Sequence, residues 1–300
     1  MMINAATLSA SRSASEQARR RRRITRLLTY ALLITCGLIF AFPLFWTLSS
    51  SLQTWQELRS YKPHLIPAVP QWGNYPHLFQ IQPMARWMLN SFMIIFLSLP
   101  GGILSATMTA YAFARFRYPG RDVWFIIMLG TMMIPSQVLL IPQYLLFFKF
   151  GWINTYYPLT VPSWLGGGAF TIFLLRQFIM SIPRDLDEAA IMDGAGPIRI
   201  LWQILVPLMK PALTTVAVLG FLGTWNDFFG PFIYLNKAKL FTAAVGLQFL
   251  TAAEMIETTR EPRDHLLMAA AAVMSLPVIL LFILAQRYFV QGVVLSGIKM

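Results

Sequence analysis

Residues 185–211 form the one sizeable stretch of this apolar chain that the sequence places in water. Asp185 can cap a short helix there, with Glu188 three residues later closing a capping box. Gly194 supplies the residue with positive φ that ends this helix. The first half of the stretch therefore predicts a capped helix that presents carboxylates on a surface.

A second short helix is expected to follow directly. Pro197 suits a first helical turn, and Pro207 and Pro211 are expected to end the helix. The small side chains of Ala189 and Ala190 allow another protein to approach closely, and the acidic first turn can bind a cationic groove. The stretch thus predicts a rigid surface that a partner protein binds.

Nothing in the sequence favours catalysis. The three histidines, His64, His77 and His265, are far apart, so neither a zinc triad nor a Ser-His-Asp site is predicted. Cys36 is the only cysteine and lies in an apolar run. No Gly-x-x-x-x-Gly-Lys-Ser/Thr loop is present, so the chain is not expected to bind a nucleotide. We expect a protein that is not an enzyme and has no metal or cofactor of its own.

Asp227 is the acidic residue of greatest interest within the predicted membrane-spanning segments. A carboxylate there is costly unless it faces protein or water. With Trp225 and Asn226 it could line a translocation path, where an aromatic face and hydrogen-bonding groups suit a sugar. It could equally lie near one membrane face and fasten helices together. Gln137, beside a proline-broken segment, is a weaker candidate for the same path.

The composition requires an integral membrane protein, because 57% of the residues are hydrophobic and only 12% are charged. The formal charge of +12 does not indicate a nucleic-acid partner, since seven arginines crowd just before the first apolar run. Basic residues there hold a membrane flank in the cytoplasm. Residues 1–26 are therefore predicted to be a cytoplasmic arm, and the apolar run after them a retained first span rather than a cleaved signal.

The predicted fold class is an all-α integral membrane protein with six transmembrane helices and a cytoplasmic two-helix loop at 185–211. A helix that crosses the membrane needs about 20 residues at about 1.5 Å each. Six segments have that length. They lie near residues 27–49, 87–114, 123–148, 157–180, 212–235 and 266–289.

Lysines and arginines set the orientation of these spans. With both termini inside, 16 of the 24 basic residues fall on the cytoplasmic side, and the 185–211 stretch does as well. Two long loops, 53–86 and 236–265, then lie outside. The first is rich in proline and aromatic residues and predicts an ordered cap. The second carries mixed charges that are either solvated or meet a soluble partner.

Proline and glycine interrupt several of the predicted spans. In a bilayer such breaks are tolerated where protein or water satisfies the freed carbonyls. They are consistent with hinges for alternating access and equally with close helix packing. The breaks lie at Pro100 to Gly102, Pro135, Pro142 and Gly166 to Gly168.

From about residue 25 onward, the sequence resembles the membrane subunits of binding-protein-dependent ABC importers, and most closely the carbohydrate-type, maltose-transporter-like permeases. The loop called the EAA loop in that family matches as Glu-Ala-Ala-x3-Gly-x9-Ile-x-x-Pro, with Val206 where leucine is usual. By resemblance, the residues that couple to an ATPase are Glu188, Ala189, Ala190, Asp193, Gly194, Ile204 and Pro207. Further matches are Asn90-Ser91, Ala110 to Arg115, Leu175 to Phe178, Trp225 to Asp227, Ala244 to Gln248 and Leu284 to Arg287.

The resemblance implies a set of partners. A second permease chain would form a heterodimer with this one, two ATPase subunits would bind ATP and Mg and dock on the EAA loop, and an extracytoplasmic binding protein would deliver a sugar or sugar-like solute. The chain would contact membrane lipid, but no nucleic acid, in the cytoplasmic membrane of a bacterial or archaeal cell. A polyol or glycerol-phosphate is an alternative solute. A gradient-driven secondary transporter is an alternative mechanism, which six spans without a visible repeat disfavour.

Overall fold

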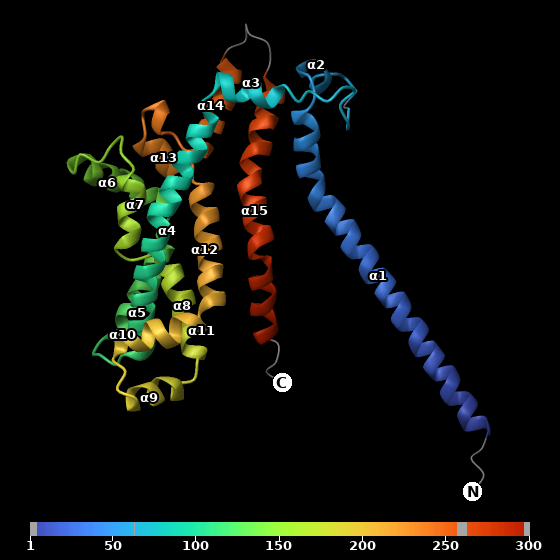
Figure 1. Cartoon of the computed structure of the whole chain (residues 1–300), viewed down its shortest axis with the longest axis vertical. Helices are drawn as coiled ribbons and strands as arrows, with labels where there is room; N and C mark the ends of the chain where they lie inside the picture. The colour runs from blue at the N-terminus through green and yellow to red at the C-terminus, as the bar shows by residue number, and fades with distance from the viewer. Residues whose placement is uncertain (1–4, 63, 257–262, 297–300) are drawn as a thin grey trace. The chain divides into compact units, whose positions relative to one another are not determined.

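The computed structural model describes residues 5–62, 64–256 and 263–296, and every regular element in these ranges is a helix (Figure 1). This confirms the all-α class. The chain folds as two units, one comprising residues 1–74 and 264–272 and the other residues 75–263 and 273–300. The candidate functional residues all lie in the second unit.

The first unit contains one long helix, α1 (Ala5–Ser51), which passes residue 26 without interruption. The predicted cytoplasmic arm and the predicted first span are therefore parts of one helix. The portion Arg21–Ser51 is long and apolar enough to cross a membrane. The unit also contains α2 (Trp55–Leu58).

The segment after α1 is ordered, as its prolines and aromatic residues predict. The side chain of Gln53 donates to the His64 carbonyl at 2.8 Å, and that of Asn74 donates to the Ser51 carbonyl at 2.9 Å. The side chain of Arg59 pairs with Asp264 at 2.6 Å. Of the charges predicted for the second outside loop, those at 257–262 lie outside the described residues.

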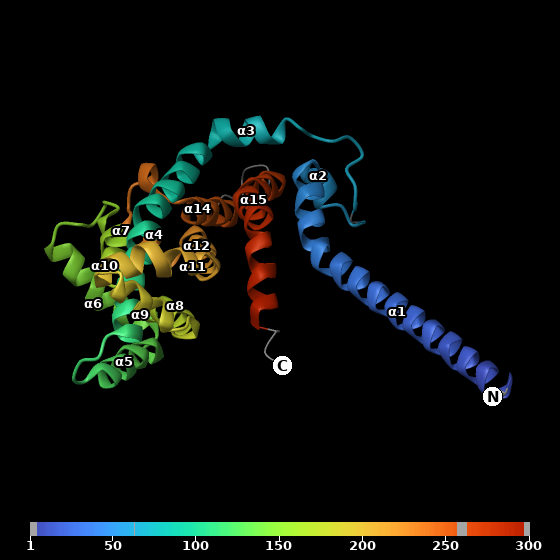
Figure 2. The ribbon, with the colours of Figure 1, turned by 60° about the horizontal axis from the view of Figure 1, so that its bottom comes forward.

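The second unit is built around α4 (Met84–Arg115), which runs between α7 and α12 in Figure 1 and leads from α3 in Figure 2. It packs against α7, α8 and α12, and more lightly against α5 and α14. The remaining bounds are α3 (Asn74–Ile81), α5 (Arg121–Gly130), η1 (Thr131–Met133), α6 (Ser136–Lys149), α7 (Tyr157–Trp164), α8 (Ala169–Ser181), α12 (Lys210–Trp225), α13 (Phe229–Tyr234), η3 (Ala238–Leu240), α14 (Ala243–Ile256) and α15 (Asp264–Ser296).

The predicted third span, 123–148, is not one continuous helix. The segments Arg121–Met133 and Gln137–Lys149 meet at a bend of 100°. Pro135 explains the break, because proline pushes the residue before it out of helical geometry. Ile134 is accordingly extended, with ψ of 116°.

The segment predicted as the fifth span, 212–235, is likewise not one continuous helix. Its helix, α12, ends at Trp225 after 16 residues, and the chain turns before α13. The turn is held by Asp227, whose Oδ1 accepts a hydrogen bond from the Gly230 amide at 3.2 Å. Aspartate commonly forms such a turn by bonding to nearby backbone. Asp227 therefore lies between two helices rather than inside one.

Four described helices are long and apolar enough to cross a membrane, and the number rises to six if each bent pair counts as one span. Those four are Arg21–Ser51, Met84–Arg115, Tyr157–Ser181 and Asp264–Gln286. The second bent pair, Pro197–Leu208 with Lys210–Trp225, overlaps the predicted 212–235 span only in its second helix, because its first helix belongs to the 185–211 stretch.

Two of the span glycines serve close packing. A Cβ on Gly101 would overlap the Trp164 ring, and a Cβ on Gly167 would overlap the Gly102 carbonyl. At Gly166 and Gly168, by contrast, nothing lies within 4 Å of the position that a Cβ would occupy. Of the two interpretations left open for these breaks, close helix contact therefore holds at Gly101 and Gly167.

Candidate functional site

The 185–211 stretch folds as two helical segments joined at Gly194, and we call it the elbow. Its first helix is α9 (Asp185–Met192). Gly194 has φ of +78°. Its amide bonds to the Ile191 carbonyl and the Ala195 amide to the Ala190 carbonyl, both at 2.9 Å, which is the Schellman arrangement.

The predicted capping box at the start of α9 is not formed. The position before the helix is occupied by Arg184 in helical conformation, with no side-chain cap, and Asp185 is already the first helical residue. The carboxylates of Asp185, Asp187 and Glu188 lie in the first turn instead. There they favour the helix through the positive end of its dipole.

The second half of the elbow ends at Leu208, between Pro207 and Pro211, the two prolines that were expected to end it. Its helix comprises α10 (Pro197–Arg199), the π-helix η2 (Ile200–Leu205) and α11 (Val206–Leu208), and meets α12 at a bend of 79°. In an α-helix the Pro207 ring would clash with the carbonyl four residues earlier, which the wider π-helical turn avoids. Pro211 belongs to the first turn of α12.

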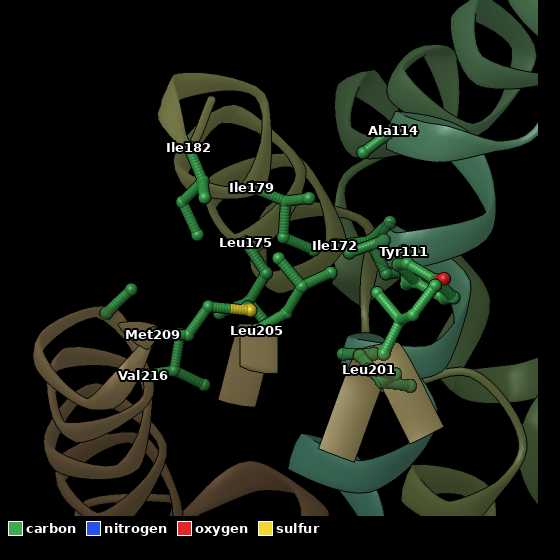
Figure 3. Packing of buried hydrophobic residues seen from close by; sticks show 14 of the residues in the cluster. Tyr111, Ala114, Ile172, Leu175, Ile179, Ile182, Leu201, Leu205, Met209 and Val216 are labelled. Atoms are coloured by element: carbon green, nitrogen blue, oxygen red, sulfur yellow. The ribbon is translucent and has the colours of Figure 1, made fainter. Parts of the chain in front are cut away.

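The inner face of the elbow is buried in the core (Figure 3). Leu205 and Met209 are fully buried and pack with Leu175 and Ile179 of α8. Burying one such side chain contributes about 1.5–3 kcal/mol. The elbow is therefore held firmly to the helices above it. The same cluster includes Ala106, Ala110, Tyr111, Ala114, Ile172, Ile182, Ala190, Ile200, Leu201, Ala212 and Val216.

The end of α4 holds the elbow through polar contacts. Nε of Arg115 lies 2.6 Å from Oδ2 of Asp187, and its Nη2 donates to the Ile182 carbonyl at 2.9 Å. One turn earlier, the hydroxyl of Tyr111 donates to the Pro197 carbonyl at 3.2 Å. Burial raises the pKa of Asp187, against the opposing attraction of the Arg115 guanidinium. Both segments of the elbow are thus tied to one helix.

The outer face of the elbow carries large apolar side chains. Met192 is 87% exposed, Ile198 76% and Ile191 59%. Acidic residues lie among them, so this face combines apolar area with negative charge. Such a surface suits a protein partner better than lipid.

The elbow residues singled out in the sequence divide between these two faces. Ala190 is buried, and Ile204 packs partly buried against the core. The remaining predicted residues are exposed: Glu188, Ala189, Asp193, Gly194 and Pro207.

Asp227 borders two cavities. One, of about 270 Å³, is lined with polar groups of Ser91, Thr224 and Thr242. The other, of about 390 Å³, brings Gln137 to Asp227 although the two are far apart in sequence. Phe147, Phe229 and Tyr234 give the second cavity an aromatic wall, and Gln143 adds a second amide. This combination of aromatic faces, amides and a carboxylate can bind a polyhydroxylated solute.

Trp225 and Asn226 do not share this position. Trp225 is 1% exposed, and its ring packs against Phe92 and Phe221 at centroid distances of 5.0 and 5.8 Å. Asn226 is exposed and donates to the Leu222 carbonyl at 3.0 Å, closing the end of α12. Neither lines the two cavities that border Asp227. In this structure Trp225 serves packing and Asn226 ends a helix.

Sequence reasoning assigned no role to Tyr111, Arg115 or Asp187, although the first two lie in a segment that it singled out. An arginine directly after the predicted span 87–114 was a usable signal, because it must reach water or a partner. Its partner 72 positions later could not be identified from spacing. Tyr234 and Thr242 were missed because their approach to Asp227 depends on tertiary folding.

Residues 98–295 match the family described as "Binding-protein-dependent transport system inner membrane component". A galactooligosaccharides transport system permease protein, GanQ of Bacillus subtilis (strain 168), is 34% identical over 93% of this chain and 97% of its own length. An sn-glycerol-3-phosphate transport system permease protein, UgpE of Yersinia pestis bv. Antiqua (strain Antiqua), is 31% identical over 91% and 97%.

A solved structure shares the fold. A bacterial ABC transporter involved in the import of the acidic polysaccharide alginate matches with a TM-score of 0.74 and 24% sequence identity, covering 90% of this chain and 98% of that one. A second structure of a bacterial alginate ABC transporter, in complex with an alginate-pentasaccharide-bound periplasmic protein, matches with a TM-score of 0.62 and 17% identity.

Proposed function

Since this chain belongs to the family of binding-protein-dependent transport system inner membrane components, it is a multi-pass membrane permease subunit and not an enzyme, and we propose that separate ATPase subunits drive it by docking on the outer face of the elbow. In this proposal ATP and Mg bind to the ATPase subunits, and this chain holds no cofactor. A second permease chain completes the pathway. A solute-binding protein of the kind that gives the family its name supplies the solute.

The observation that carries the docking proposal is the contrast between the two faces of the elbow. The inner face is locked into the core, whereas the outer face exposes Met192, Ile198 and Ile191 beside acidic residues. A surface that transmits force must not flex, and the buried face supplies that rigidity. The distribution of basic residues favours a cytoplasmic position for the elbow and both termini. The outer face of the elbow would then lie on the side of the membrane where ATP is available.

Co-purification tests the docking. In the variant Glu188→Lys with Met192→Lys, reversed charge and lost apolar area are expected to abolish recovery of the ATPase with the permease from detergent. Tyr61→Lys is the matched control, because Tyr61 is 99% exposed and lies in the predicted outside loop. Full ATPase recovery and native uptake in the double variant would refute docking at the elbow.

For the solute, we propose an uncharged oligosaccharide. Asp227 is the one charged residue that lines either of its two cavities, which lie within the described part of the chain. A carboxylate binds sugar hydroxyls well and repels a phosphate or carboxylate solute. This favours the galactooligosaccharide-type relatives over the glycerol-phosphate type.

Uptake by the reconstituted importer tests the solute class. A neutral galactooligosaccharide is expected to be transported, and sn-glycerol-3-phosphate is not. Asp227→Asn should reduce uptake about 10-fold or more, the loss expected when a charged hydrogen-bonding group is removed. Asn226→Ser is the neighbouring control that lines neither cavity, and it should transport normally. Transport of the phosphate ester at a comparable rate would exclude the proposed class.

A further inference from the structure

Arg115 and Asp187 form a buried ion pair that stability alone does not explain. Their side chains are 7% and 13% exposed. Removing two charges from water costs several kcal/mol, and apolar residues of similar size often stabilise a protein as well or better. Oδ1 of Asp187 is moreover buried without a hydrogen-bond partner in the part of the chain that the structure describes. The pair instead fixes where α9 lies relative to the end of α4.

The same guanidinium also holds the end of α8. Its Nη2 bonds to the carbonyl of Ile182, the residue at which α8 stops. In the other direction, Nη2 of Arg184, the residue before α9, donates a hydrogen bond to the Ala114 carbonyl of α4 at 3.4 Å. Because Tyr111 holds Pro197 as well, displacement of either elbow segment must displace the end of α4.

At its other end, side chains of α4 form hydrogen bonds with the backbone of residues 238–243. Nε1 of Trp87 donates to the Ala238 carbonyl at 2.9 Å, and Nδ2 of Asn90 donates to the carbonyls of Lys239 and Phe241 at 3.0 and 2.9 Å. The hydroxyl of Ser91 accepts from the Ala243 amide at 2.9 Å. Ser91 and Thr242, which belong to this contact, also line the smaller Asp227 cavity.

Between these ends, contacts from α7 support α4 at the point where a proline interrupts its backbone hydrogen bonds. Pro100 lies mid-helix and removes one backbone donor. Trp164 of α7 lies across this region and donates from Nε1 to the Leu97 carbonyl at 2.8 Å, and Ser105 donates to the Ser163 carbonyl at 3.0 Å. A helix of 32 residues spans about 48 Å at about 1.5 Å per residue, so α4 connects distant parts of the unit.

We propose that α4 is a strut that carries displacement of the elbow to the 238–243 segment and the Asp227 cavity, with Arg115 as the positioning residue that couples the elbow to it. The inference rests on the proposed docking of ATPase subunits at the elbow. The proposed route passes from the elbow to α4 through the ion pair between Asp187 and Arg115. These residues are far apart in the sequence, so the displacement does not have to travel along the backbone from the elbow into α12.

The test uses the complete transporter in proteoliposomes, with both permease chains, the ATPase and solute-loaded binding protein. Arg115→Gln and Asp187→Asn should leave ATPase recovery and basal ATP hydrolysis unchanged. Both variants should reduce two quantities about 10-fold: the stimulation of ATP hydrolysis by loaded binding protein, and solute uptake. A 10-fold change is within the usual range of coupling between distant sites. Because the two residues act as one contact, the double variant should lose no more than the worse single variant. Asn90→Leu, at the far end of α4, should show the same loss of stimulation.

A control removes a charge nearby without touching the contact. Arg117→Gln alters an exposed residue two positions after Arg115 and should stimulate normally. If Arg115→Gln fails to assemble, Arg115→Lys keeps a cation facing Asp187 and should assemble with partial stimulation. If the assembled Arg115 and Asp187 variants are stimulated as well as the native chain, the inference is wrong. If these variants lose stimulation but Asn90→Leu does not, α4 is not the route by which the displacement travels. Failure of the proposed function looks different, because the native chain would then recover no ATPase.

Discussion

Gly194 sets the geometry of the elbow through its backbone alone. Its φ of +78° lies in the left-handed region, and nothing lies within 4 Å of the position that a Cβ would occupy. A substitution there is therefore strained without being crowded, which separates the conformational effect from packing.

We expect Gly194→Ala to destabilise the protein by about 1 kcal/mol, the usual cost of holding a side chain in the left-handed region. Gly194→Asn should cost less, because asparagine tolerates this conformation. Thermal unfolding of the purified permease, with ATPase recovery measured in parallel, checks both. Equal stability of the alanine variant and the native chain would contradict a structural need for positive φ.

At single residues, the sequence predicted what depends on local backbone chemistry. The positive φ of Gly194 and the first-turn position of Pro197 are confirmed. The capping role of Asp185 is wrong, because Arg184 already adopts helical angles and moves the start of the helix by one residue. The burial of Trp225 could not be predicted, because it depends on Phe92 from a distant helix.

At the scale of elements, length and hydropathy predicted where apolar helices occur but not where they bend. The 123–148 segment has the composition of one span, yet Pro135 divides it at 100°. The 212–235 segment is divided by the turn at Asp227. Hydropathy measures how apolar a segment is and contains no information on where its helix axis changes direction. In the sequence, only Pro135 and Asp227 marked the positions of these two breaks.

Gly101 lets α7 approach α4, and its replacement should disturb that contact. A Cβ on Gly101 overlaps the Trp164 ring, which also donates to the Leu97 carbonyl. We expect Gly101→Ala to cost about 1–3 kcal/mol, as overpacking does. Gly130→Ala is the matched control, with open space around it, and should be neutral or slightly stabilising. Thermal unfolding compares the two variants, and a native unfolding temperature for Gly101→Ala would refute the packing role.

The capping box of α2 should make the segment that follows α1 sensitive to acid. The Thr54 amide donates to the Glu57 carboxylate at 3.0 Å, and this bond lowers the pKa of Glu57, while burial opposes it. A lowered pKa in the folded state stabilises the fold above the ordinary pKa, and this stability is lost as the pH falls through the folded value.

Unfolding temperatures of the native chain and Glu57→Gln measure this effect. The native chain should be the more stable at neutral pH. The difference should shrink as the pH falls below the ordinary carboxyl pKa of about 4, and it should be lost once the pH is below the lowered pKa of the folded state. A difference independent of pH would show that the carboxylate charge contributes nothing.

For the whole molecule, the distribution of basic residues predicts which surfaces face each compartment. Cysteines introduced at Tyr61 and Ile198, which are 99% and 76% exposed, report the two sides. In a Cys36→Ser background expressed without the ATPase, a membrane-impermeant thiol reagent should label position 61 in intact cells and position 198 only after permeabilisation. Labelling of position 198 in intact cells would place the elbow outside and exclude contact with a cytoplasmic ATPase.

The all-α class and the membrane location were available from composition, and the family from the resemblance that Glu188 to Pro207 carry. Gln137 and Asp227 were assigned to one candidate path, but nothing in the sequence indicated that Arg115 meets Asp187. Both contacts join residues that are far apart in the chain, and no local pattern encodes which elements become neighbours. The elbow could therefore be identified from the sequence, but not the contacts that hold it.

The π-helical segment η2 absorbs one extra residue in a wide turn. Each of its turns closes one residue later than in an α-helix, as in the bond from the Val206 amide to the Leu201 carbonyl. Deleting one residue here would therefore restore an α-helical turn and largely keep the phase of the helix that follows. It would also bring the Pro207 ring against the carbonyl four residues earlier. The length of this segment and the proline that follows it therefore depend on each other, and a deletion of one codon is expected to be tolerated only together with replacement of Pro207.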